Sequence, residues 1–145
     1  MAQQDVRWVQ RFEHFVKGLA QLEDAEQLAR ARDLTNLERQ GFIKGFEFTF
    51  EQAWLTLKDF LESRGVQGLY GAKDAIQGAF RSGLVANGEV WMDMIQSRNL
   101  TSHTYDETTS ARILTVIRTD YIGEFEALKT TLAEIAARPT AGDAP

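Results

Sequence analysis

The fold of this 145-residue chain is decided by residues 45–61, Gly45-Phe46-Glu47-Phe48-Thr49-Phe50-Glu51-Gln52-Ala53-Trp54-Leu55-Thr56-Leu57-Lys58-Asp59-Phe60-Leu61. Large apolar residues recur here at the three- and four-residue spacing of an amphipathic helix. The pattern extends on both sides and predicts a helix from Asn36 to Arg64, with Gly65 as its C-terminal cap. Because the apolar residues spread around more than one face, we expect a central helix that is covered on several sides or also faces another subunit.

Two further long helices are predicted on either side of this one. The apolar stripe of the first contains Trp8, Phe12, Phe15, Leu19 and Leu22. The last helix is expected to start after Tyr105, with either Asp106 as its N-cap or Thr104 and Glu107 as a capping box. Its stripe continues for about six turns through Leu114, Ile117, Tyr121, Phe125, Leu128, Leu132 and Ile135.

Two short helices are predicted between the second and the last long helix. The first has an inward stripe of Ala75, Ile76, Ala79 and Phe80, and Gly83 is expected to end it. The second begins near Gly88 and directs Trp91, Met94 and Ile95 inward. Since no segment shows the alternating pattern of a strand, the sequence predicts an all-α protein, an up-and-down antiparallel helical bundle of three long and two short helices.

Composition limits the organisation of the chain and its location. With 43% hydrophobic residues, the chain is expected to form one domain over residues 1–138. Both prolines lie in the terminal segment 139–145, which is predicted to be a disordered tail. The chain has no cysteine, no recognisable export signal and no apolar run long enough to span a membrane, and these features favour a cytoplasmic protein without a membrane partner.

The charged residues restrict the classes of ligand. A net charge of -5 argues against a general nucleic-acid-binding protein, although it allows a local basic site. The chain has only two histidines, His14 and His103, and neither lies in a dense group of carboxylates. We therefore expect no metal site within one chain and no cofactor.

One short polar segment carries most of the reactive side chains. The run Arg98-Asn99-Leu100-Thr101-Ser102-His103-Thr104-Tyr105-Asp106-Glu107 lies between two apolar helical segments. In a continuous helix, Arg98 and His103 would point about 140° apart, so they can act together only if the helix ends near Asn99 or Leu100. The arginine would then hold a phosphate and the histidine would transfer a proton. The alternative is structural: Arg98 pairs with carboxylates of the last helix, and His103 and Asp106 satisfy backbone groups of the turn.

Three blocks of the sequence resemble one family. The polar run resembles the R-N-x-x-x-H-x-Y motif of HEPN proteins, in the small helical group that accompanies a minimal nucleotidyltransferase and is often called nucleotidyltransferase substrate-binding. Residues 45–61 resemble the aromatic second helix of that group. Residues 75–84, followed by Gly88-Glu89-Val90-Trp91, resemble its short-helix region. The resemblance spans nearly the whole chain apart from the tail.

The resemblance implies a homodimeric helical bundle with a nucleotidyltransferase partner encoded nearby. It implies a toxin that cuts RNA without a metal ion, in which Arg98 and His103 carry the reaction and two subunits each supply a copy of the motif. Tyr105 matches the tyrosine to which some partner enzymes attach AMP. One departure is Ser97, since the residue before the motif arginine is often acidic in this family.

The remaining motif residues are given supporting roles as a hypothesis. Asn99 would orient the turn, and Glu47 and Asp106 would tune the charges of Arg98 and His103. The sequence thus favours a metal-independent endoribonuclease toxin that AMP transfer neutralises, in a toxin–antitoxin-like module. A non-catalytic subunit that presents a substrate to the nucleotidyltransferase is the alternative, and a structural adaptor is a third interpretation.

Overall fold

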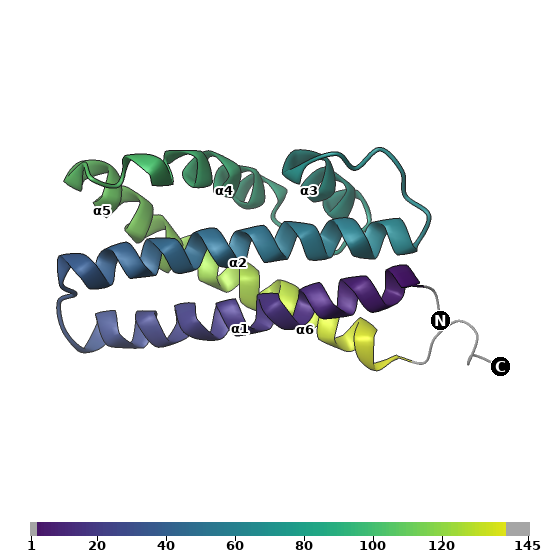
Figure 1. Cartoon of the computed structure of the whole chain (residues 1–145), viewed down its shortest axis with the longest axis horizontal. Coiled ribbons are helices and arrows are strands. Elements are labelled where there is room, and N and C mark those ends of the chain that lie inside the picture. Colours follow the sequence, from purple (N-terminus) through teal and green to yellow (C-terminus); the bar gives the residue numbers. More distant parts are fainter. Residues whose placement is uncertain (1–2, 139–145) are drawn as a thin grey trace.

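The computed structural model describes residues 3–138, with side chains from residue 6 onward. The predicted tail at 139–145 lies outside the described residues. In Figure 1, α1 (Gln3–Ala31) and α2 (Asn36–Ser63) form a long antiparallel hairpin. The shorter helices α3 (Ala72–Arg81) and α4 (Gly88–Leu100) lie together along α2, on the side away from α1.

A short 3₁₀ turn, Thr101–His103, follows α4 and leads into the last helical segment. This segment consists of α5 (Glu107–Val116), a π-helical turn at Ile117–Tyr121 and α6 (Ile122–Ala137). It crosses the α1–α2 hairpin obliquely in Figure 1, and α5 contacts α2 while α6 contacts α1. Over the described range all regular structure is helical, which confirms the predicted all-α bundle with three long and two short helical segments.

Aromatic side chains from four helices meet in the core. The ring of Phe125 on α6 lies 5.8 Å from Phe15, 6.3 Å from Phe46 and 5.6 Å from Trp91, measured between ring centroids. All four residues are fully buried. Rings of this size contribute large buried apolar areas. The residues that the sequence pattern assigned to the stripes of α1, α2, α4 and α6 therefore hold the bundle together.

The helix ends follow local signals in the sequence. Thr35 and Glu38 form a capping box at the start of α2, in which the Thr35 side chain accepts a hydrogen bond from the Glu38 amide and Glu38 accepts one from the Thr35 amide. Gly65 follows α2 with a φ of 89°, a value that glycine adopts without strain. Asp106 caps α5 by accepting a hydrogen bond from the Thr108 amide, which settles the choice between the two predicted caps.

Two expectations need correction. The sequence pattern predicts Phe80 on the buried stripe of α3, but 53% of its surface is exposed, because Ala75, Ile76 and Ala79 already cover the face that α3 presents to the core. The last helix is interrupted by the π turn, in which the Ile122 amide donates to the Ile117 carbonyl, five residues earlier. Ile117 and Tyr121 at its two ends remain fully buried.

Candidate functional site

The candidate site is the connection between α4 and α5, where the predicted helix break occurs. Helix α4 ends at Leu100, within the range that cooperation between Arg98 and His103 requires. The Thr101 hydroxyl donates to the Arg98 carbonyl at 2.7 Å, and the Thr101 amide donates to the same oxygen. These bonds satisfy a carbonyl that the end of the helix leaves free, so Thr101 defines the break.

Arg98 is fixed by groups of α2. Its Nη1 donates to Glu51 Oε2 at 3.2 Å, and its guanidinium carbon lies 5.5 Å from the centroid of the buried Phe50 ring. Its Nε donates to Asn99 Oδ1 at 3.3 Å. The Arg98 side chain is 31% exposed and that of Glu51 is 43% exposed, so this ion pair is partly solvated. A phosphate can therefore compete with Glu51 for the guanidinium.

Glu51 is the carboxylate beside Arg98 that the sequence pattern does not identify. Glu47, the predicted carboxylate, instead pairs with Lys44, with its Oε2 at 3.1 Å from the Lys44 Nζ. Glu51 lies one helical turn after Glu47, so both carboxylates share one face of α2. Both also line a hollow of about 440 Å³ together with Arg98. The shared face was visible in the sequence, but the choice between the two carboxylates depends on where α4 lies along α2.

His103 and Tyr105 lie on the far side of the break. Both residues are exposed, Tyr105 to 85%, and their ring centroids are 6.3 Å apart. Across residues 3–138, no hydrogen bond, ion pair or ring contact joins His103 to Arg98. Within the described part of one chain, the cation and the imidazole are therefore not connected by any of these interactions.

The turn that carries His103 and Tyr105 is anchored to α2. Gln40 Nε2 donates to the Thr104 carbonyl at 3.1 Å, and the Thr104 hydroxyl donates to Gln40 Oε1 at 2.9 Å. A second hollow of about 670 Å³ adjoins this anchor, with Arg39, Tyr105 and Ser110 in its wall. The sequence offered no local signal for Gln40, because it lies 64 positions from Thr104.

Asp106 has a defined structural role. Besides the Thr108 amide, its carboxylate accepts a hydrogen bond from the Thr109 hydroxyl at 2.7 Å. This hydroxyl and the backbone amides of the first turn hold the pKa of Asp106 below its usual range. The Asp106 amide donates to the His103 carbonyl at 3.2 Å, so Asp106 fixes the backbone beside the histidine.

Ser97, which replaces the acidic residue common before the motif arginine, faces the core. Its Oγ lies 2.6 Å from the hydroxyl of Tyr121, which donates to Asp93 Oδ2 at 2.6 Å. Burial raises the pKa of Tyr121 above its usual range. Ser97 therefore serves the packing of α4, and Glu51 supplies the carboxylate beside Arg98.

The described residues contain no group of three or more His, Asp or Glu side chains placed to bind a metal ion. Among the same residues, no helix is long and apolar enough to cross a membrane.

Comparisons with known proteins identify relatives over most of the chain. The family described as "nucleotidyltransferase substrate binding protein like" matches residues 10–134. A protein of Haemophilus influenzae named "Probable ribonuclease HepT" is 37% identical over 71 residues. This match covers 46% of the present chain and 49% of the relative, so it spans about half the length of that protein.

Two solved structures share the fold. A protein of Thermus thermophilus is 28% identical, with a TM-score of 0.69, over 86% of this chain and 99% of its own. A second, from Haemophilus influenzae, is 25% identical, with a TM-score of 0.64, over 90% of this chain and 99% of its own. Its structure is described as revealing the fold of a substrate binding domain of a nucleotidyltransferase.

Proposed function

The chain belongs to the nucleotidyltransferase substrate-binding protein-like family, the HEPN group that pairs with minimal nucleotidyltransferases, and on this premise we propose that it is the toxin of a toxin–antitoxin-like module. Its activity is cleavage of RNA without a metal ion, and its partner nucleotidyltransferase neutralises it by AMP transfer. The observation that carries the proposal is the helix break at Leu100. Because of this break, Arg98 lies in the last turn of α4 and the exposed His103 lies at the end of the 3₁₀ turn that follows.

The chemistry is transfer of the phosphodiester to the neighbouring ribose oxygen. Arg98 holds the non-bridging phosphate oxygens, and the hydrogen bond from its Nε to Asn99 limits its orientation. His103 takes the proton of the ribose 2′-OH, because an imidazole exchanges protons near neutral pH. The 2′ oxygen attacks phosphorus, the bond to the 5′ oxygen breaks, and that oxygen takes a proton. The products are a 2′,3′-cyclic phosphate and a 5′-hydroxyl.

A homodimer supplies the second proton-transfer group. One imidazole cannot act as base and acid at the same moment, whereas the partner subunit's His103 can protonate the leaving oxygen while the first takes the 2′ proton. The face of α2 beside Arg98 supports such an assembly, because Phe48 is 46% exposed there and lines the same hollow as Glu51 and Arg98. Gln52 on this face also has a buried Oε1 without a hydrogen-bond partner.

Tyr105 is the proposed site of regulation. Its exposed phenol oxygen attacks the α-phosphorus of ATP in the partner enzyme, and pyrophosphate leaves. The attached AMP adds a negative charge close to His103, because the Tyr105 and His103 ring centroids are 6.3 Å apart. This charge repels the phosphate backbone of RNA. The accessibility of the ring and its distance from the histidine support this role.

The test of the activity is RNA cleavage in EDTA. Wild-type protein is expected to release fragments that end in 2′,3′-cyclic phosphate, and His103→Ala should lower the rate at least about a hundredfold. His14→Ala is the matched control, because His14 is the other histidine and is exposed on α1. If wild-type protein does not cut, or His103→Ala cuts as fast as His14→Ala, the ribonuclease proposal is wrong.

The alternative is a non-catalytic subunit that presents a substrate to the nucleotidyltransferase. The description of the Haemophilus influenzae structure as a substrate binding domain favours it, and so does the pairing of Arg98 with Glu51 in the free chain. Under this alternative, RNA stays intact in EDTA, and removal of the protein lowers the rate of the partner enzyme on its substrate.

A further inference from the structure

A second cavity, away from the α4–α5 turn, lies between α3 and the first turns of α4. It has a volume of about 780 Å³, within the range of small-molecule sites. The side chains of Asp93 and Gln96 line it and lie about 140° and 160° from Arg98 around the axis of α4. The cavity therefore opens on a different face of the helix from the candidate catalytic site.

An aromatic ring is held in the wall of this cavity. The ring of Phe80 packs against the backbone of Gly88, where an added Cβ would lie only 3.0 Å from the Phe80 ring. The residue is nevertheless 53% exposed. Since one side is held by backbone and much of the rest is open, Phe80 presents a fixed surface on which a planar group can stack.

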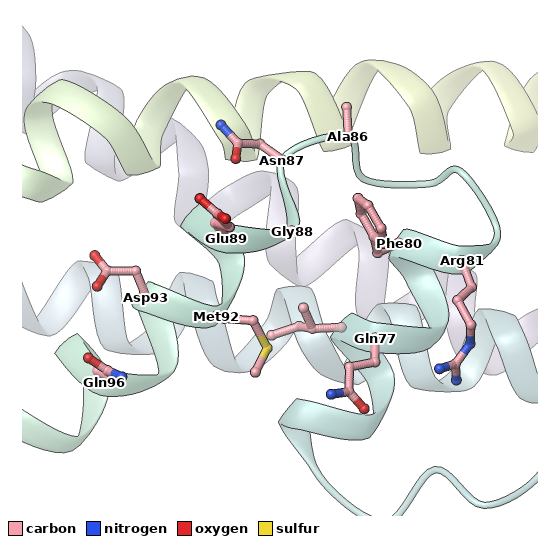
Figure 2. Close-up of a pocket in the computed structure, with 11 residues that line it drawn as sticks. Gln77, Phe80, Arg81, Ala86, Asn87, Gly88, Glu89, Met92, Asp93 and Gln96 are labelled. Carbon is pink, nitrogen blue, oxygen red and sulfur yellow. The ribbon is translucent and has the colours of Figure 1, made fainter.

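Polar groups of opposite charge flank this ring. Figure 2 shows Glu89 and Asp93 on the α4 side of the cavity and Gln77 and Arg81, together with Phe80, on the α3 side. Asp93 already accepts the hydrogen bond from the Tyr121 hydroxyl. Over residues 3–138, Glu89, Arg81 and Gln77 have no side-chain hydrogen bond or ion pair within the protein.

We propose that this cavity binds a nucleotide whose base carries an amino group. The base stacks on Phe80, its amino edge donates to the Glu89 carboxylate, and its phosphate extends to Arg81 and Gln77 on the other side. A planar ring, a donor edge and an anion are the three features that the cavity can satisfy, and a nucleotide combines them. The nucleotide can be free or part of an RNA strand, and the experiment separates these sources.

The test is binding to the full chain, measured by calorimetry with AMP, GMP, CMP and UMP as probes. Uracil has no amino group, so UMP is expected to bind about tenfold more weakly than the other three. Phe80→Leu should weaken binding of AMP at least about fivefold, because it removes the stacking surface. Tyr70→Leu is the matched control, because Tyr70 is 90% exposed and does not line the cavity.

Gly88→Ala separates loss of the site from loss of the fold. The new methyl group displaces the Phe80 ring, so binding should fall as in Phe80→Leu. The melting temperature should not fall, because alanine favours a helix more than glycine does. Glu89→Gln should reduce the preference for AMP over UMP, with Glu134→Gln on the exposed face of α6 as its control.

A 2′-O-methyl oligonucleotide, which has no free 2′-OH to attack phosphorus, shows whether the bound nucleotide is free or part of an RNA strand. Binding of the oligonucleotide but not of mononucleotides, with dependence on Phe80, supports the site and assigns it to a strand. Saturable binding of mononucleotides supports a free ligand. The proposal is wrong if no probe binds, if UMP binds as well as AMP, or if Phe80→Leu matches wild type. It is also wrong if Phe80→Leu impairs only binding of the nucleotidyltransferase, since the cavity would then be a protein-docking surface.

Discussion

At the scale of single residues, Arg98 shows how a candidate catalytic cation is held before a substrate arrives. A guanidinium next to a partly exposed carboxylate keeps a defined position at a modest energetic cost, because solvent screens the pair. In the free chain Glu51 pairs with the Arg98 guanidinium. Because the Glu51 side chain is partly exposed, a phosphate can displace it from the arginine. Binding of RNA would therefore replace the contact between Arg98 and Glu51 by a contact between Arg98 and a phosphate.

This exchange predicts the effect of Glu51→Gln. Without the negative charge, the phosphate no longer competes with a carboxylate, so a 2′-O-methyl RNA should bind about two- to fivefold more tightly. Fluorescence anisotropy at fixed ionic strength measures the change. Glu47→Gln, which removes the charge beside Lys44, should have a smaller effect. Equal or weaker binding by Glu51→Gln would show that Glu51 does not compete for Arg98.

Tyr105 gives the second prediction at this scale. After incubation of the chain with its neighbouring nucleotidyltransferase and ATP, the intact mass should increase by the mass of an AMP group, and Tyr105→Phe should abolish the increase because the acceptor oxygen is absent. Tyr70→Phe is the control, since Tyr70 is equally exposed but lies outside the motif. An adduct that persists in Tyr105→Phe would place the modification elsewhere.

At the scale of elements, the start of α2 links helix capping to pH. The Arg32 guanidinium, with the Thr35 backbone, lowers the pKa of Glu38 to about 2. The folded state thus favours the ionised carboxylate, and the stabilisation is present above the ordinary glutamate pKa of ~4.3 and lost as the pH falls towards 2. The capping box that begins the central helix should therefore weaken in acid.

Glu38→Gln tests this link. At pH 7 the variant should unfold at a lower denaturant concentration than wild type, because glutamine keeps the cap geometry but loses the ion pair with Arg32. The difference should shrink steadily between pH 4.5 and pH 2, as measured by urea unfolding followed by circular dichroism. A difference that stays constant over this range would mean that the charge of Glu38 does not stabilise α2.

At the scale of the whole molecule, the candidate site is assembled from parts distant in the sequence. Helix α2 supplies both Glu51 for Arg98 and Gln40 for the turn that carries His103, while the end of α4 and the connection that follows it supply the motif. Arg98 and the turn that carries His103 are therefore both attached to the same central helix. Since one imidazole cannot act as base and acid at the same moment, the proposed mechanism depends on a second copy of the chain.

The prediction for the whole molecule is that the chain forms a homodimer through the face of α2 that carries Phe48. Light scattering coupled to size-exclusion chromatography should give twice the chain mass of 16.4 kDa for wild type. Phe48→Glu should give the single mass and lose RNA cleavage, because a charge on the proposed interface opposes association. Tyr70→Glu places the same charge on a distant exposed aromatic position and should remain dimeric. A wild-type mass of one chain at micromolar concentration would contradict the two-copy site.

The helices and their buried faces follow from the sequence pattern alone. The stripes of α1, α2, α4 and α6 rest on spacings of three and four residues, which the pattern contains. From the sequence two caps remained possible for the last helix, and the break before His103 was a condition for cooperation with Arg98; the structure shows the Asp106 cap and the break. The motif also indicated Arg98 and His103 as candidate site residues, but it did not indicate how their side chains lie relative to one another.

Helix packing, by contrast, determines that Glu51 and not Glu47 contacts Arg98, that Gln40 holds the turn, and that Phe80 faces a cavity. Each of these depends on how far one helix is shifted along another, a quantity that packing of the whole core fixes and that no local pattern records. The π turn belongs with them, because the apolar stripe runs through Ile117 and Tyr121 at ordinary α-helical spacing and carries no local signal for the interruption.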